Sequence, residues 1–229
     1  MRRRASTTLS ATVLAALTIS GCSGSSATAG TTGSSPTAAA KLAPAAKPAA
    51  LLTSAVLTER LLDESDLGQN YTRKPENGSN RDDVTVIGCP ALEELGGDAA
   101  AGGSLDFPNS ANATFAYTRS TDSEVAEELY SDTVDKLGPG TKSVFEAMTG
   151  CPLYQVVVGD SPIAVATQKL PAPALGDEAW SQLLTFTTGG HDTVMKQTAV
   201  RSGSVLVVVS GSPALVDTHL NRAVDKARG

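Results

Sequence analysis

The spacing of apolar and polar residues predicts two kinds of element, and strands dominate the second half of the chain. Short runs rich in β-branched residues are separated there by turn sequences, which is typical of strands. The run Val205–Val209 is apolar without interruption, so we expect a central strand that is covered on both faces or nearly so. The five expected strands are residues 153–158, 163–170, 180–188, 193–201 and 204–210.

Helical spacing occurs on either side of these strands. A short apolar stripe predicts a helix from Thr53 to about residue 62, and Ser212-Pro213 marks the start of a last helix that runs to about residue 227. A strand is expected at 112–119 because apolar and polar residues alternate there.

The middle of the chain predicts two further helices. The sequence Thr121-Asp122-Ser123-Glu124 has the form of a capping box, so we expect a helix from there to about residue 137 with an acidic outer face. Gly138-Pro139-Gly140 should break that helix, and a second helix should follow and end at Cys151-Pro152. Together these elements predict an α+β domain with a largely antiparallel sheet and helices packed on it.

The N-terminus carries a targeting signal. Three arginines, Arg2 to Arg4, precede an apolar run at 11–19 and small residues, as in a secretory signal peptide. The stretch Ile19-Ser20-Gly21-Cys22 resembles the lipobox of bacterial lipoproteins, which implies that Cys22 is lipidated and becomes the first mature residue. The alternatives are an ordinary signal peptide with an incidental cysteine, or a membrane span, for which the run is short.

Three parts therefore follow one another: a lipoprotein signal peptide at 1–21, a tether at 22–50 and a single folded domain at 51–229. The tether consists mainly of Ser, Thr, Gly, Ala and Pro, cannot build a core and is expected to be disordered. As a flexible coil it reaches about 30 Å. The expected location is the outer, extracytoplasmic face of the cell membrane, with lipid on Cys22 as the anchor.

The charge of the folded part excludes some partners. Of the 18 Lys and Arg residues, five precede residue 51, which leaves 13 against 24 Asp and Glu and a net charge of −11. Such a domain repels phosphate backbones and anionic headgroups, so nucleic acid is excluded and membrane attachment depends on the lipid.

Two cysteines remain once Cys22 is assigned. Cys89 and Cys151 are expected to form a disulfide, since disulfides persist outside the cell membrane; two buried free thiols are the alternative.

Catalytic motifs are lacking. The chain has two histidines, His191 and His219, and neither lies in a recognisable catalytic or zinc-binding motif. We therefore expect no enzymatic activity, no cofactor and no metal site.

Two sequence stretches identify a family resemblance. Leu175-Gly176-Asp177-Glu178-Ala179-Trp180, then Val200-Arg201-Ser202-Gly203-Ser204-Val205 and a terminal amphipathic helix, resemble the PknH-like extracellular sensor domain of actinobacteria, over about 51–229. The resemblance implies an α+β fold with a cleft over the sheet and binding of an unidentified extracytoplasmic ligand. Several members have two disulfides, whereas this chain can form only Cys89–Cys151. The sequence contains no kinase region, so signalling would need a protein partner.

The predicted function is therefore a membrane-anchored ligand-binding or sensory domain. The candidate ligand contacts are two strand residues with polar tips, Tyr117 and Trp180, and two arginines at strand ends that suit an anionic group, Arg119 and Arg201. The aromatic residues on these strands equally suit a hydrophobic core. Two other functions stay open: a carrier of lipid or another apolar molecule, and a hydrolase with an unrecognised site.

Overall fold

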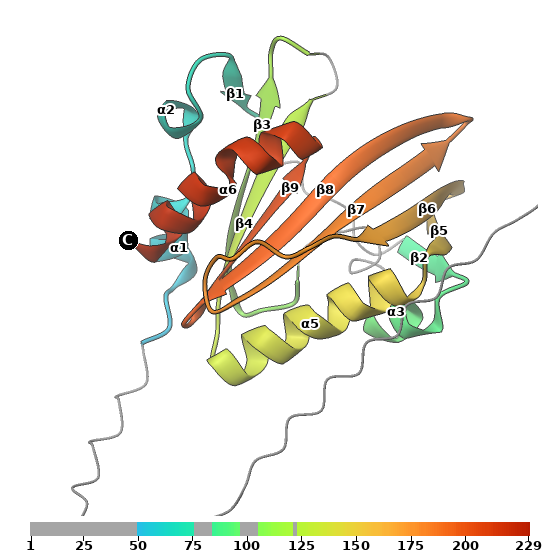
Figure 1. The fold of residues 1–229 in the computed structure, drawn as a ribbon, viewed down its shortest axis with the longest axis horizontal. Helices are drawn as coiled ribbons and strands as arrows, with labels where there is room; N and C mark the ends of the chain where they lie inside the picture. Colours follow the sequence, from blue (N-terminus) through green and yellow to red (C-terminus); the bar gives the residue numbers. More distant parts are fainter. Residues whose placement is uncertain (1–49, 76–83, 97–104, 121–122) are drawn as a thin grey trace, which may run out of the picture. The chain divides into compact units, whose positions relative to one another are not determined.

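A nine-stranded antiparallel sheet forms the centre of the domain (Figure 1). The computed structural model describes residues 50–75, 84–96, 105–120 and 123–229, so the expected signal peptide and nearly all of the tether lie outside the described residues. The strand order is β1-β3-β4-β9-β8-β7-β6-β5-β2. The strands are β1 (Tyr71–Arg73), β2 (Val84–Ile87), β3 (Asn109–Tyr117), β4 (Glu124–Ser131), β5 (Leu153–Val158), β6 (Ser161–Lys169), β7 (Glu178–Thr188), β8 (His191–Ser202) and β9 (Val205–Gly211).

The sheet and its helices confirm the predicted α+β class. The described helices are α1 (Ser54–Arg60), α2 (Glu64–Leu67), α3 (Pro90–Leu95), α5 (Val134–Gly150) and α6 (Pro213–Arg228). Strand β9 lies centrally, and all of its residues are buried, as its uninterrupted apolar run predicts. None of these helices is long and apolar enough to span a membrane.

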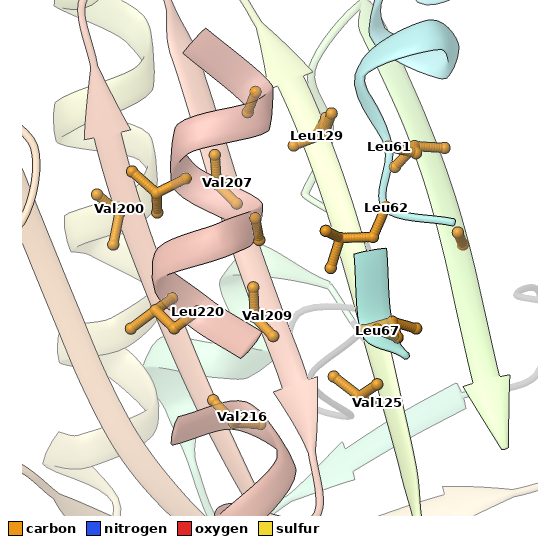
Figure 2. Close-up of a cluster of buried hydrophobic side chains, with 14 of the residues drawn as sticks. Leu61, Leu62, Leu67, Val125, Leu129, Val200, Val207, Val209, Val216 and Leu220 are labelled. Carbon is orange, nitrogen blue, oxygen red and sulfur yellow. The ribbon is translucent and has the colours of Figure 1, made fainter. Parts of the chain in front are cut away.

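Helices α1 and α6 cover one face of the sheet. Alternate residues of β4, among them Val125 and Leu129, point to this face and pack with Val207 and Val209 of β9. Figure 2 shows these side chains together with Val216 and Leu220 of α6 and with leucines from the α1–α2 segment. We call this the α6 side of the sheet.

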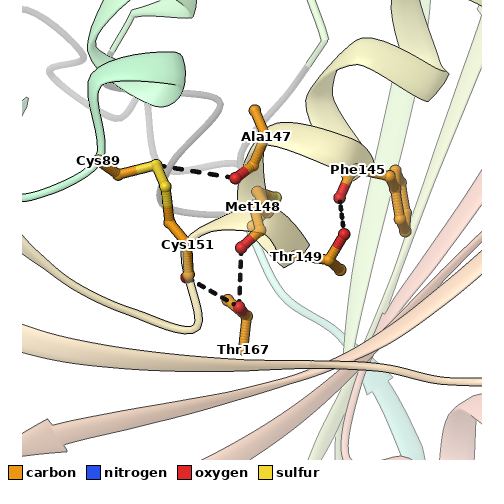
Figure 3. The surroundings of a disulfide bond; sticks show 7 residues. All are labelled: Cys89, Phe145, Ala147, Met148, Thr149, Cys151 and Thr167. Atoms are coloured by element: carbon orange, nitrogen blue, oxygen red, sulfur yellow. Dashed lines mark hydrogen bonds between the residues drawn. A yellow bond between two sulfur atoms is a disulfide. The ribbon is translucent and has the colours of Figure 1, made fainter.

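Helices α5 and α3 belong to the opposite face. The intervening β4 residue Tyr130 points there and packs with Leu137 and Phe145 of α5, next to a second cluster that contains Met148. The disulfide Cys89–Cys151 joins the start of α3 to the end of α5, as predicted (Figure 3). The Thr167 hydroxyl of β6 donates to the carbonyls of Met148 and Cys151, which fixes the end of α5 on the sheet.

The predicted helix from the capping-box sequence to about residue 137 is wrong. Residues Glu124–Ser131 form strand β4, which pairs with β3 on one side and β9 on the other. The segment has apolar Val125 and Leu129 four residues apart, a spacing that fits a helix and a strand equally well. Two full ladders of backbone hydrogen bonds decide in favour of the strand. Glu127 then lies inside the domain instead of on a helix surface.

The predicted break at Gly138-Pro139-Gly140 is also wrong, because α5 continues through these residues. The glycines allow close contact: a Cβ at Gly138 would lie 2.7 Å from a carboxylate oxygen of Glu178, and one at Gly140 would lie 3.1 Å from the Phe107 ring. Pro139 is exposed and lies early in the helix. The glycines therefore serve packing, and the helix is one element.

Candidate functional site

The predicted ligand contacts lie on both faces of the sheet. Tyr117, at the end of β3, is half-buried on the α6 side, where its ring centroid lies 5.0 Å from that of Tyr71. Arg119 follows in an exposed turn. Trp180 of β7 lies on the α5 side and packs against Phe145, with ring centroids 6.4 Å apart. The structure therefore does not bring Tyr117 and Trp180 together, and their contact with a ligand stays a prediction.

Arg201 holds two loops together at one end of the sheet. Its side chain is only 7% exposed; Nε donates to Glu178 Oε2 at 3.0 Å and Nη1 donates to Asp177 Oδ2 at 3.1 Å. The Gly203 amide donates to the same Asp177 oxygen at 2.7 Å. The positive charge of Arg201 is thus already balanced by the carboxylates of Asp177 and Glu178. A role of Arg201 in binding an anionic ligand stays a prediction.

Gly176, which directly precedes Asp177, must be a glycine because it lies against the backbone of Arg201. Gly176 has a φ of +65°, and a Cβ there would lie 2.3 Å from the Arg201 carbonyl oxygen. The Asp177 amide donates to that carbonyl at 2.7 Å. The residues that carry the family resemblance therefore join the loop before β7 to the β8–β9 turn. In these contacts the residues stabilise the fold.

A charged cluster connects α6 to α2. Lys226 donates to Asp63 at 2.9 Å and also to Asp66, which in turn accepts from Arg222 at 2.6 Å. Burial opposes charge on Asp66, but the hydrogen bonds from Lys226 and Arg222 outweigh it and lower the pKa of Asp66. Burial also opposes charge on Lys226, yet its carboxylate partners raise the pKa of Lys226. Both groups are therefore charged at neutral pH.

Glu127 of β4 is a buried carboxyl group beneath this cluster. Its side chain is 1% exposed, Oε2 accepts the Leu62 amide at 2.6 Å, and Oε1 has no hydrogen-bond partner among the described residues. Burial raises the pKa of Glu127 to about 7, against the opposing effects of the Leu62 amide and the Lys226 charge. The sequence indicated an exposed acidic residue here. Only the correct strand assignment would have placed it inside.

His219 and Tyr71 form a polar pair between α6 and β1. The Tyr71 hydroxyl lies 2.7 Å from His219 Nε2, and the two rings meet edge to face. Burial lowers the pKa of His219 and raises that of Tyr71, so the neutral forms are favoured. His219 precedes Arg222 and Lys226 by three and seven residues, which places the three side chains along one side of α6.

The outer strands leave part of the α6 side exposed. Register places Leu153, Ala166, Thr185 and Val194 in one row across β5, β6, β7 and β8. A second row runs across β2, β5, β6 and β7 and consists of Ile87, Gln155, Ala164 and Thr187. We call these eight residues the open face. The second row continues on β8 with Asp192, whose carboxylate accepts the Thr187 hydroxyl at 2.6 Å, so an acidic residue borders the open face.

The open face differs from the rest of the surface in its chemistry. None of its residues is charged, and Leu153, Ile87 and Val194 are 67%, 50% and 45% exposed. None of the eight belongs to the core cluster that α1 and α6 form on the same side. Exposed apolar surface of this kind is typical of interaction sites. Among the described residues, no group of three or more His, Cys, Asp or Glu side chains is placed to hold a metal ion.

Comparisons with known proteins identify the fold. No family model and no curated protein matches the sequence. The extracellular domain of PknH from Mycobacterium tuberculosis has a similar crystal structure, with a TM-score of 0.58 and 13% identity, and the match covers 78% of this chain and 98% of that domain. An uncharacterized protein from Mycobacterium smegmatis matches with a TM-score of 0.42 at 10% identity over 76% of this chain and 97% of that one. The chain has the fold of the PknH extracellular domain.

Proposed function

We propose that this protein is a lipid-anchored sensory domain on the outer face of the cell membrane, which binds a ligand and does not catalyse a reaction. The observation that supports the proposal most directly is the fold, which is similar to the PknH extracellular domain over 98% of that domain. The sequence adds support for export and anchoring, because its N-terminus has the form of a signal peptide and the stretch that ends at Cys22 resembles a lipobox. Signalling to the cell interior then requires a protein partner.

The lipid anchor is tested at Cys22. Replacing Cys22 with Ala removes the sulfur that receives the lipid, so incorporation of an alkyne fatty acid should fall to background and the precursor should accumulate. Ser23→Ala, one residue further on, is the matched control and should be labelled like the wild type. Undiminished label on the Cys22→Ala protein would refute the anchor.

The open face supports an apolar ligand. The eight residues carry no charge, and the two charges that border them already have partners: Asp192 accepts the Thr187 hydroxyl, and Lys196 is paired with Asp217. Leu153, Ile87 and Val194, in contrast, offer exposed hydrocarbon. The acidic domain also repels anionic headgroups. We therefore propose a neutral envelope lipid as the ligand, bound through its apolar chain. The same surface would serve the second candidate function, a carrier of lipid.

Thermal unfolding of the full chain tests the ligand. Neutral lipid at a hundred times its dissociation constant should add about 2.7 kcal/mol of stability. Leu153→Asp places a charge on the open face and should abolish this shift. Val158→Asp is the matched control, since Val158 is 45% exposed on the same strand but its side chain points to the opposite face.

Two outcomes would contradict lipid binding. A shift that survives Leu153→Asp would place the ligand elsewhere, and a shift only with cell-wall fragments or metals would exclude the lipid. Turnover of an ester or peptide that is lost on substitution of a single Ser or His would establish the hydrolase instead.

A further inference from the structure

The segment from Leu52 to Leu67 lies across the α6 side of the sheet, and we call it the strap. It contains α1 and α2 and buries four leucines in the core. Figure 2 shows three of them, Leu61, Leu62 and Leu67, beside Val125 and Leu129 of β4. Glu127 lies between those two β4 residues and points to the same face, so the strap covers its carboxyl group.

The immediate surroundings of Glu127 contain little that stabilises a negative charge. Its neighbours in the sheet are Ala113 of β3 and Val209 of β9, both apolar. The strap contributes one donor, the Leu62 amide.

The charged groups that face Glu127 come from three other elements. Lys226 of α6 and Arg73 of β1 favour the ionised form, and Asp66 of α2 opposes it. Lys226 is already paired with Asp63 and Asp66. Within the part of the chain that the structure describes, Glu127 therefore has one direct hydrogen bond and no ion pair.

We propose that Glu127 is a proton-binding site that couples the pH of the surrounding solution to the closure of the strap on the sheet. With the strap closed, the carboxyl group is not accessible to water. When the strap opens, water reaches the carboxyl group. Proton release at Glu127 therefore favours opening, and proton binding favours closure.

The linkage between proton binding at Glu127 and strap opening sets the direction of the pH effect and the pH range over which it acts. In the closed state the pKa of Glu127 is raised from 4.5 to about 7, and opening returns it towards 4.5. Because the pKa is raised in the closed state, the stabilisation of the closed strap by protonated Glu127 is fully present below pH 4.5 and is lost as the pH rises through 7. Between pH 5 and pH 8 the opening constant of the strap should increase roughly 10- to 100-fold.

Other titrating groups near the strap act at different pH or with the opposite sign. Hydrogen bonds lower the pKa values of Asp63 and Asp66, so these groups titrate below pH 4. Burial lowers the pKa of His219, so its contribution is lost as the pH falls below about 6.5, opposite to that of Glu127. The effect of Glu127 is therefore isolated by comparing variants at each pH.

Hydrogen exchange of the full chain tests the proposal. Exchange of peptides that cover residues 52–67 is measured from pH 5 to pH 8 in the wild type and in Glu127→Gln, which keeps an acceptor for the Leu62 amide but cannot ionise. The ratio of wild-type to variant exchange should rise 10- to 100-fold over this range. Glu124→Gln, an exposed position on the same strand, should behave like the wild type.

A ratio that stays constant between pH 5 and pH 8 would overturn the proposal. Carboxyl-carbon NMR of the wild-type chain provides a second test that does not depend on folding of the variant. A midpoint for Glu127 near 7 supports the proposal, and one near 4 refutes it. Neither measurement requires a lipid anchor or a ligand, so the outcome is independent of the proposed function.

Discussion

The helices on the two faces of the sheet are secured by different chemistry. On the α5 side, the Cys89–Cys151 disulfide joins α3 to α5 covalently. On the α6 side, α2 is held to α6 by ion pairs of Asp63 and Asp66 with Lys226 and Arg222, above the buried carboxyl group of Glu127. We therefore expect the first side to respond to reductant and the second to pH. One sheet can thus carry a fixed helical layer and an adjustable one.

The largest effect is expected on the covalent side. Replacing Cys89 and Cys151 together with Ser removes a bridge between residues 62 positions apart. On the loop-closure model this costs about 4 kcal/mol in the free energy of unfolding, and denaturant titration measures it. Reducing the wild type should give the same loss. A loss below about 1 kcal/mol would show that non-covalent packing suffices to hold α3 and α5.

A smaller effect is expected from the ion pairs. Lys226→Met keeps an apolar stem but removes the cation. The Asp66 carboxylate then keeps only the Arg222 cation and the Asp63 amide among its described partners, so the change should cost about 1–2 kcal/mol at pH 7. Because the pKa of Asp66 is lowered, this contribution is present above pH 3.8 and is lost as the pH falls. The difference in stability between the two proteins should therefore shrink as the pH falls below 3.8. An equal difference at pH 3 and pH 7 would assign the cost to packing.

The smallest effect is expected on the open face. Leu153→Ala should change the free energy of unfolding by less than about 0.5 kcal/mol, because Leu153 is 67% exposed. Leu129→Ala provides the contrast: this fully buried leucine on β4 should cost about 2–5 kcal/mol. A large cost at Leu153 would mean that its side chain is covered in the folded protein, and the open face would then not be available to a ligand.

Elements with one clear period were predictable from the sequence. The strands from β5 to β9 and helix α6 follow their β-branched runs and apolar stripe closely. Strand β4 was not, because a buried Glu127 interrupts its alternation and a capping-box sequence precedes it. Helix α5 was not predictable as one element, because Gly138 and Gly140 have the local sequence of a helix break. The two glycines are instead needed for close contact with Glu178 and Phe107.

The candidate sites also divide into those that the sequence predicted and those that it did not. The disulfide followed from the number of cysteines and the expected compartment. The cluster around Lys226 joins residues about 160 positions apart, and no local pattern predicts such a contact. Arg201 was expected at a ligand, but its partners are the carboxylates of Asp177, just before β7, and Glu178, the first residue of β7.

The strand order also constrains when the chain can fold. Strand β4 pairs with β9, whose residues follow it by about eighty positions; Glu127, for example, lies opposite Val209. Until β9 has been synthesised, the hairpin of β3 and β4 has no sheet to join, and its apolar side chains have no core. The C-terminal hairpins of β7, β8 and β9 are local and can form quickly. Completion of the domain therefore waits for β9, and the incomplete chain must be kept from aggregating until then.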